Sequence, residues 1–123
     1  DDRYFLNQGR KIWYHCFVEA DSFELHLDYK AQFPGYVWLQ PEKDGTATIV
    51  GIHVREGFRN TGLGTVMFQE AVKQVRDRVT CIKGVLEKEY YPEPEDSFRW
   101  LHRQGFEIKE KENGDYEVEL WLR

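Results

Sequence analysis

The first third of the chain alternates between apolar and polar residues with a period of two, the pattern of strands that bury one face. In the run SFELHLDYK the two sets are Phe23, Leu25 and Leu27 on one side and Glu24, His26 and Asp28 on the other. The runs KIWYHCFVE and GYVWLQ are equally rich in β-branched and aromatic residues. Turn signals at Ala20-Asp21 and Phe33-Pro34-Gly35 separate these runs. We therefore expect an antiparallel meander from Lys11 to Gln40.

A hairpin turn at Asp44-Gly45 leads into one more strand, TATIVGIHV. Beyond this strand the apolar period changes from two to about 3.6, which predicts a helix ending near Arg78. Its apolar face consists of Leu63, Val66, Met67, Ala71, Val75 and Val79. The next run, VTCIKGVL, predicts a strand buried on both faces. Strand, helix and strand in this order predict a βαβ unit with parallel strands.

The last third of the chain predicts a short helix and a hairpin. Prolines precede the helical run SFRWLHRQ, and Gly105 is placed to end it. FEIKEKENGDYEVELWLR predicts a hairpin around Asn113-Gly114. Because no linker or repeat interrupts the chain, we predict one domain over residues 1–123. Its fold class is α+β, with a mixed, mostly antiparallel sheet around a central βαβ unit.

Composition and charge narrow the function classes. A chain of 123 residues can bury a core without metals or disulfides. Its net charge of −5, with no basic block, argues against a nucleic-acid partner. No apolar run approaches ~20 residues and no signal peptide is present, so we expect no membrane partner and a cytoplasmic location. Cys16 and Cys81 lack partners at metal-ligand spacing, so we expect buried, inert thiols and no metal site.

A glycine segment, Arg59-Asn60-Thr61-Gly62-Leu63-Gly64, lies between the predicted strand and the long helix. Glycines permit close approach of a ligand, and the unpaired N–H groups of a first helical turn attract anions. A Walker loop is excluded because Thr65-Val66 follows Gly64 where Lys-Ser/Thr is required. A dinucleotide fingerprint is excluded as well, because it needs three glycines early in a parallel α/β chain. The alternative to an anion site is a turn that only packs the helix on the sheet.

These features together resemble the GNAT superfamily of acyl-CoA-dependent N-acetyltransferases. The family signature Gln/Arg-x-x-Gly-x-Gly/Ala is matched by residues 59–64, and IHVREGFR is similar to the strand and turn before it. The helix SFRWLHRQ, which runs into Gly105-Phe106, is similar to the family's later helix. The resemblance covers the chain from about Thr46 to its C-terminus. It implies a GNAT-like fold.

The resemblance also implies acetyl-CoA as cosubstrate, with its pyrophosphate on the backbone amides of the glycine segment. Pantetheine would lie like an added strand in a V-shaped opening, bonded to the backbone of Ile52 and Val54. Arg99 and Arg103 are either contacts for the nucleotide phosphates or solvated surface arginines. The predicted cofactor-binding residues are Ile52, Val54, Arg59, Asn60, Thr61, Gly62, Leu63, Gly64, Thr65 and Ser97.

Acetyl transfer to an amine requires a proton acceptor and stabilisation of the developing oxyanion. His53 alternates with Ile52 and Val54, so it points to the opposite face of its strand, and it is the predicted catalytic base. The backbone amide of Val54 is the candidate oxyanion donor. The polar residues Glu24, His26 and Asp28 either form a water-linked relay or face solvent.

The chain departs from the family pattern at two positions and at its N-terminus. Leu101 stands where many members carry a Tyr that protonates the leaving thiolate, so the thiolate leaves unassisted or Tyr90 or Tyr91 substitutes. Pro94 stands where an Asn commonly contacts pantetheine. The usual N-terminal helix pair has no room, so the acceptor side is open or is completed by another subunit of a possible homodimer. The candidate interface aromatics are Trp13, Tyr14, Tyr36 and Trp38.

The sequence thus predicts an N-acetyltransferase that moves an acetyl group from acetyl-CoA to a primary amine of a small molecule or protein. The alternative is a non-catalytic domain of the same fold that binds CoA or serves as an interaction module, which Leu101 supports. The intact glycine segment favours the enzyme. Transfer of a different acyl group is a third hypothesis.

Overall fold

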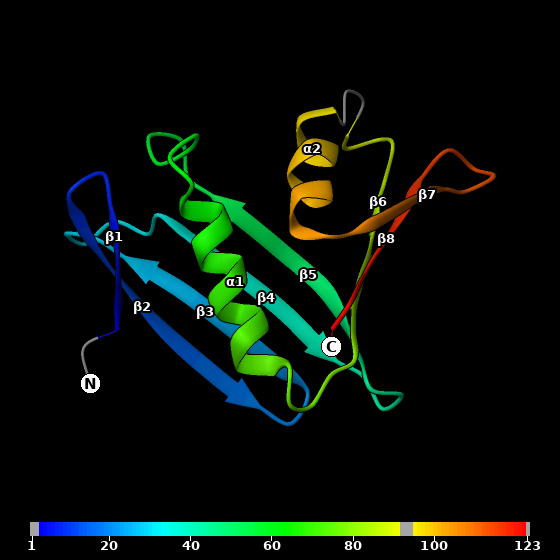
Figure 1. Cartoon of the computed structure of the whole chain (residues 1–123), viewed down its shortest axis with the longest axis horizontal. Helices are drawn as coiled ribbons and strands as arrows, with labels where there is room; N and C mark the ends of the chain where they lie inside the picture. The colour runs from blue at the N-terminus through cyan, green and yellow to red at the C-terminus, as the bar shows by residue number, and fades with distance from the viewer. Residues whose placement is uncertain (1–2, 92–94, 123) are drawn as a thin grey trace.

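A computed structural model of the chain describes residues 3–91 and 95–122 (Figure 1). Within these residues, strands and helices alternate much as the hydropathy pattern predicts. The elements are β1 (Tyr4–Asn7), β2 (Arg10–Glu19), β3 (Ser22–Asp28), β4 (Gly35–Pro41), β5 (Thr46–Val54), α1 (Leu63–Val75), β6 (Cys81–Leu86), α2 (Glu95–Gln104), β7 (Glu107–Glu110) and β8 (Tyr116–Trp121).

The strands of the described residues form one sheet in the order β1-β2-β3-β4-β5-β6-β8-β7. Every neighbouring pair is antiparallel except β5 and β6, which are parallel and joined through α1. Helix α1 crosses one face of β3, β4 and β5, in front of the sheet in Figure 1. The predicted α+β class and the central βαβ unit are confirmed.

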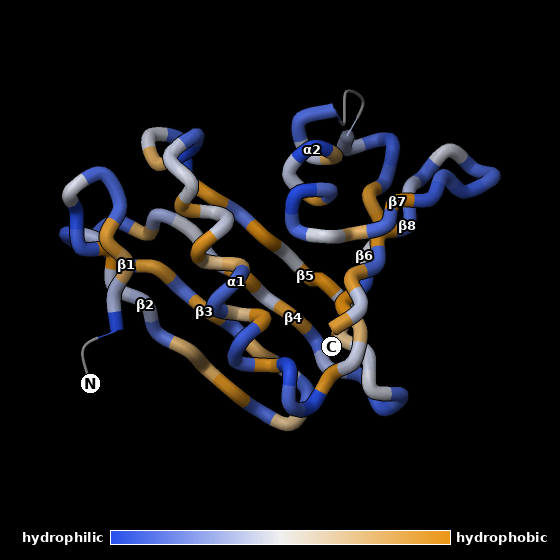
Figure 2. Tube along the Cα trace, viewed as in Figure 1, coloured by the Kyte–Doolittle hydropathy of each residue, from blue (hydrophilic) through white to orange (hydrophobic). Residues whose placement is uncertain are grey.

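The core lies between α1 and the sheet. Phe23, Leu25 and Leu27 of β3 are fully buried, as their alternation predicts. Figure 2 shows the hydrophobic stretches of β3, β4 and β5 behind α1, whereas α2 is largely hydrophilic. The buried face of α1 includes Phe68, which lies outside the predicted stripe, whereas Val66 is only half-buried.

The meander begins one strand earlier than predicted. Strand β1 pairs with β2 through a turn whose central residues, Gln8 and Gly9, have φ of 53° and 73°. Positive φ at both positions suits the right-handed twist of a hairpin. At the next turn Glu19 pairs directly with Ser22, so β2 passes into β3 with no helices between them. As predicted, the described residues contain no helix pair between the first strands, and the face of β2–β5 opposite α1 is left uncovered by any described helix.

Strands β5 and β6 separate after a short parallel contact. Pairing covers only Thr46–Thr48 of β5 and the first half of β6. Just beyond it the β4–β5 register shifts, so that Ile49 pairs with Leu39 but Gly51 pairs with Trp38, leaving Val50 as a bulge. A bulge bends its strand. The rest of β5 therefore diverges from β6, as the predicted V-shaped opening requires.

Two predicted details are wrong. VTCIKGVL is not buried on both faces, because β6 leaves β5 after Lys83 and its outer half meets solvent, so that Val85 is 50% exposed. Helix α1 ends at Val75 rather than near Arg78, because the chain turns there to bury Val79. The predicted C-terminal hairpin of β7 and β8 is confirmed, as is the end of α2 at Gly105, whose φ is 100°.

Candidate functional site

The glycine loop, residues 55–62, connects β5 to α1 and leaves the first turn of α1 without a side-chain cap. Gly62 is the N-cap residue, with φ of 83°, and the backbone N–H groups of the turn after it have no side-chain cap. A Cβ atom on Gly62 would meet nothing within 4 Å. The amides of Leu63, Gly64 and Thr65 therefore begin the helix beside open space, as an anion site requires.

Gly64 serves a different purpose from Gly62. A Cβ atom there would lie 3.3 Å from Cγ2 of Val54 and 3.9 Å from Nε1 of Trp100. A glycine thus lets α1 approach the end of β5 and the side of α2 at once. Gly62 thus keeps the start of α1 open, and Gly64, two residues later, allows the close contact between α1 and β5.

Arg59 fastens the loop to the strand before it. Its Nε donates a hydrogen bond of 2.8 Å to the carbonyl oxygen of Val54. This bond uses one N–H of the guanidinium, while the side chain stays exposed. Arg59 therefore sets the shape of the loop and keeps a positive charge beside it.

The backbone of Ile52 and Val54 faces the opening between β5 and β6. The amide of Arg55 donates to the carbonyl of Pro34 across from it, at 2.7 Å, so Arg55 and His53 direct their backbone groups toward β4. Alternation along an antiparallel strand then turns those of Ile52 and Val54 the other way. No described strand pairs with that edge beyond Thr48. Apart from the Val54 carbonyl held by Arg59, this edge is free to pair with an extended ligand.

Asn7, which the sequence analysis does not select, supports the glycine loop from β1. It is the one polar residue with a buried side chain in the described part of the chain, 8% exposed. Its Nδ2 donates to the carbonyl oxygen of Thr61 at 3.0 Å, and Arg10 donates to its Oδ1 at 3.3 Å. The Arg10 guanidinium also lies 4.5 Å from the centre of the Phe58 ring. Nothing in the sequence around Asn7 indicates that this residue contacts a loop 54 residues away.

Thr65 joins the two helices through its side chain. Its Oγ1 accepts hydrogen bonds from Nε1 of Trp100 at 3.1 Å and from Nε2 of Gln104 at 3.3 Å. The rings of Trp100 and Phe68 pack nearby, with centroids 5.4 Å apart. Ser97 is half-buried on α2, one turn before this contact. Thr65, one of the predicted cofactor residues, thus uses its hydroxyl group to hold α1 and α2 together. Its backbone amide still belongs to the uncapped first turn of α1.

His53 lies on the uncovered face of the sheet, as predicted, and is exposed. The register places it in one cross-strand row with Tyr36, His26 and His15. Ring centroids are 5.9 Å apart for His53 and Tyr36 and 6.0 Å apart for Tyr36 and His26. Nε2 of His26 is 2.9 Å from Oε1 of Glu24. The structure therefore joins Glu24 and His26 directly and connects them to His53 through the Tyr36 ring.

Leu101 packs into the core, and Pro94 lies outside the described residues. Leu101 is 6% exposed and belongs to the cluster between α1, α2 and the sheet. Tyr90, 69% exposed, and Tyr91, 40% exposed, precede α2. The Leu101 side chain thus has a packing role at the position where the family often has a Tyr.

Leu101→Tyr is accordingly expected to destabilise the protein by about 1–3 kcal/mol through overpacking, without faster turnover. Leu101→Met, which nearly conserves volume, should cost less than about 1.5 kcal/mol and serves as control. Urea unfolding and kcat are the measurements. A Tyr variant of unchanged stability and higher kcat would show that a missing acid limits the reaction.

Neither cysteine is an activated nucleophile. Burial raises the pKa of the Cys81 thiol, and burial followed by the nearby Glu70 carboxylate raises the pKa of Cys16, against an opposing effect of Arg3. A raised pKa keeps both thiols protonated at neutral pH. Cys81 is buried, as predicted, while Cys16 is only half-buried. The described residues contain no His, Cys, Asp or Glu cluster able to hold a metal ion, and no helix among them is long and apolar enough to cross a membrane.

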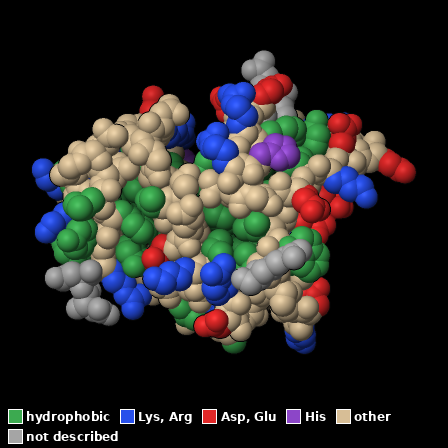
Figure 3. Space-filling view, in the orientation of Figure 1, with side chains coloured by type: hydrophobic (Ala, Val, Ile, Leu, Met, Phe, Trp, Pro, Cys, Tyr) green, Lys and Arg blue, Asp and Glu red, His purple; other side chains and the backbone are tan. Residues whose placement is uncertain are grey.

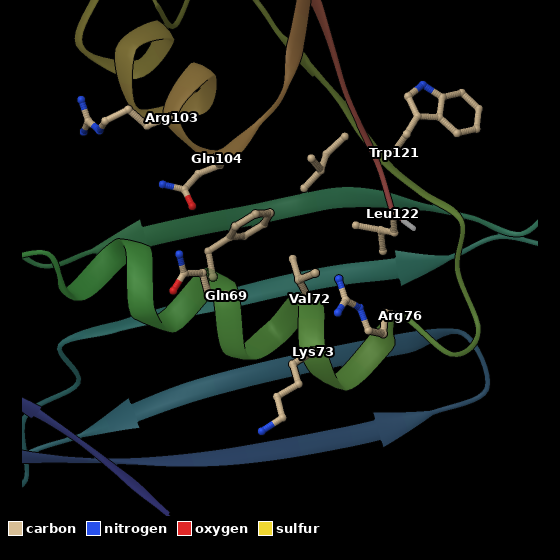
Figure 4. A pocket seen from close by; sticks show the side chains of 10 residues that line it. Gln69, Val72, Lys73, Arg76, Arg103, Gln104, Trp121 and Leu122 are labelled. Carbon is tan, nitrogen blue, oxygen red and sulfur yellow. The ribbon is translucent and has the colours of Figure 1, made fainter.

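A hollow of about 360 Å³ lies between α1, the end of α2 and the end of β8 (Figure 4). Lys73 borders it from α1, Arg76 from the C-cap of that helix, and Arg103 from α2. Figure 3 shows blue basic side chains beside exposed hydrophobic ones on this face of the molecule. None of the predicted cofactor residues lines this hollow. Of the two arginines considered for the nucleotide phosphates, Arg103 thus borders this separate hollow, and Arg99 is bonded to Asp96 on its own helix.

The fold and the glycine loop together define a class of protein. Its members have a mixed sheet that opens after one parallel pair of strands, and beside the opening lies a helix that follows a glycine and has no side-chain cap. The sequence profile of the Acetyltransferase (GNAT) family matches residues 2–106, and the chain therefore belongs to that family. The resemblance inferred from the glycine segment is confirmed. The comparison with curated proteins found no match.

Solved structures with the same fold include three acetyltransferases. PaiA N-acetyltransferase from Thermoplasma acidophilum, in complex with coenzyme A, is 14% identical with a TM-score of 0.71, over 83% of this chain and 62% of that one. A GNAT family acetyltransferase from Elizabethkingia anophelis with acetyl-CoA bound is 14% identical with a TM-score of 0.72, over 90% of this chain and 98% of that one. An acetyltransferase from Thermus thermophilus is 18% identical with a TM-score of 0.68, over 85% of this chain and 67% of that one. The chain thus spans less than two thirds of the Thermoplasma protein.

Proposed function

We propose that this chain is an N-acetyltransferase that transfers the acetyl group of acetyl-CoA to a primary amine. The observation that carries the proposal is the uncapped first turn of α1 beside the unpaired edge of β5. Family membership and the cofactors bound to the Thermoplasma and Elizabethkingia structures support it.

The cofactor would be held mainly by backbone groups. A pyrophosphate carries about two negative charges, and the start of α1 offers oriented amides with about half a positive charge. The amides of residues 60–65 would donate to the pyrophosphate in the open space at Gly62, and Arg59 would add charge. The edge of Ile52 and Val54 would pair with the amide groups of pantetheine, and Ser97 would approach it from α2.

His53 would accept the proton of the attacking amine on the face of the sheet opposite α1. A neutral imidazole can take this proton directly or through water. The amide of Val54 points into the opening and would donate to the oxyanion that forms as nitrogen attacks the thioester carbon. The resulting tetrahedral species would then expel the CoA thiolate, to which Leu101 offers no hydroxyl proton, so that the thiolate leaves unassisted or Tyr90 or Tyr91 protonates it.

A non-catalytic domain that binds CoA is the second candidate, and the buried Leu101 favours it. The two candidates agree on cofactor binding and differ on chemistry. Only the enzyme releases CoA thiol in proportion to added amine. The row of His53, Tyr36 and His26 beside the opening favours the enzyme, since binding alone has no need of it.

Binding is tested by the effect of CoA on thermal unfolding. A ligand that binds only the native state at ~100 times its Kd stabilises the protein by about 2.7 kcal/mol. We therefore expect CoA and acetyl-CoA to raise Tm in a concentration-dependent way, and adenosine alone to raise it far less. An unchanged Tm at saturating CoA would overturn the proposed function.

Asn7→Ala is expected to weaken CoA binding although residue 7 lies outside the glycine segment. The variant removes the donor to Thr61, so the loop loses its anchor and stability falls by about 1–3 kcal/mol. Calorimetric Kd for CoA and urea unfolding are the measurements. Asn113→Ala, in the distant β7–β8 turn, is the control and should keep the CoA affinity of the unmodified protein. Equal affinity in the Asn7 variant would show that the loop needs no support from β1.

A further inference from the structure

The hydroxyl oxygen of Thr65 accepts two hydrogen bonds, and both donors belong to α2. Nε1 of Trp100 donates to it at 3.1 Å, and Nε2 of Gln104 donates at 3.3 Å. Trp100 and Gln104 lie one helical turn apart on the same face of α2. Two donors from one helix thus converge on a single oxygen atom of the other helix.

These two contacts leave the Thr65 hydroxyl group with its proton to donate. A hydroxyl oxygen has two acceptor positions and carries one proton. The indole N–H of Trp100 and the side-chain amide nitrogen of Gln104 are both donors only. Because they occupy the two acceptor positions of Thr65, any third partner of this hydroxyl group has to be an acceptor.

The helix itself does not take up this proton. A helical threonine often donates to a backbone carbonyl three or four residues earlier, which for Thr65 means Gly62 or Thr61. The Gly62 carbonyl already accepts from the amide of Val66 at 3.2 Å, and the Thr61 carbonyl accepts from Nδ2 of Asn7 at 3.0 Å. The described residues contain no hydrogen bond that the Thr65 hydroxyl group donates. Its proton is therefore available to a ligand.

The hydroxyl group lies beside the uncapped first turn of α1. Thr65 is the third residue of this helix, and its half-buried side chain faces α2. Cα–Cβ bonds in a helix tilt toward its N-terminus, which brings the hydroxyl group toward the amides of Leu63 and Gly64. Nε1 of Trp100 borders the same turn, 3.9 Å from the position of a Cβ on Gly64. The Thr65 proton is therefore close to the backbone amides proposed to bind pyrophosphate.

We propose that Trp100 and Gln104 are positioning residues for the cofactor and act through Thr65. By occupying both acceptor positions of the Thr65 oxygen, they direct its proton toward the start of α1, where a pyrophosphate oxygen accepts it. A hydrogen bond to a charged oxygen is roughly twice as strong as one between neutral groups, so the orientation of this proton contributes to affinity. The inference rests on the proposed binding of acetyl-CoA, and it assigns a role to residues of α2 that do not touch the cofactor.

The test is a double-mutant cycle on the Kd for CoA, measured by calorimetry. Trp100→Phe keeps an aromatic ring and removes the N–H, and we expect it to weaken CoA binding by about three- to tenfold. Thr65→Val removes the hydroxyl group and nearly keeps the shape of the side chain, and it should weaken binding by about tenfold. Because Trp100 acts through Thr65, the double variant should bind CoA no more weakly than Thr65→Val alone.

Three further variants complete the cycle. Thr65→Ser restores a hydroxyl group and should recover the affinity of the unmodified protein. Gln104→Met removes the second donor and should weaken CoA binding by about threefold. Trp121→Phe, at the exposed end of β8, is the matched control for Trp100→Phe and should keep the affinity of the unmodified protein. Urea unfolding without ligand shows in parallel that each variant is folded.

A structural role of Trp100 gives a different result from a positioning role. It would lower the free energy of unfolding and leave the Kd for CoA unchanged, or it would add its full effect to that of Thr65→Val. Either result would overturn the inference, as would tighter CoA binding by Gln104→Met, which would mean that Gln104 accepts the Thr65 proton and competes for it. Failure of the proposed function is distinct, because the unmodified protein would then bind no CoA, or would bind it with the expected losses in the variants and acetylate no amine.

Discussion

Gly62→Val is expected to abolish the rise in Tm that CoA gives to the unmodified protein. Gly62 has φ of 83°, where a valine is strained by about 1–2 kcal/mol. Its added side chain would enter space that contains no atom within 4 Å, in front of the amides proposed to bind pyrophosphate. We therefore expect the variant to lose CoA binding although its own free energy of unfolding falls only modestly.

The control for Gly62→Val carries the same backbone strain far from the site. Gly45, in the β4–β5 turn, has φ of 85°, and a Cβ there would meet only Thr80 Oγ1 at 3.7 Å. Gly45→Val should lower Tm by a similar amount and keep the full CoA-dependent shift. A Gly62 variant that is still stabilised by CoA would place the pyrophosphate elsewhere.

His53→Gln is expected to lower kcat/KM for a good amine by roughly 10²- to 10⁴-fold, the usual effect of a positioned acid–base group. In the unmodified protein kcat/KM should rise with pH, because a general base accepts a proton only in its deprotonated form. The variant should lose this rise. Glutamine keeps the approximate size of the side chain, so CoA binding should be unchanged.

The control for the histidine is the same substitution at a distant exposed position. His102 lies on α2 and is exposed on the other side of the cofactor opening. His102→Gln should leave both the rate and its pH dependence unchanged. An unaltered pH profile in His53→Gln would show that another group, or solvent, accepts the proton.

Local patterns in the sequence were sufficient to predict the order of elements from β2 onward. The alternation in β3 predicts which residues are buried, because a strand with one buried face has period two. The glycine segment predicts its own loop, because positive φ at Gly62 and close packing at Gly64 are local requirements. The family assignment followed from these same residues.

Features that depend on distant contacts could not be predicted. The support of the loop by Asn7 joins residues 54 positions apart. The row from His15 to His53 exists only because the registers of three strand pairs place these residues opposite one another. The exposed half of β6 follows from the bulge at Val50, which is defined only by pairing with β4. Each of these features depends on which distant residues the fold brings together, which local residue types do not specify.

The most direct test of the account is amine-dependent release of CoA thiol from acetyl-CoA by the purified protein. We expect thiol release to increase with the concentration of a primary amine, and the product amine to gain the mass of one acetyl group. His53→Gln should reduce both signals together. A protein that binds acetyl-CoA but releases no thiol with any primary amine would contradict the assignment as an N-acetyltransferase and leave a CoA-binding domain.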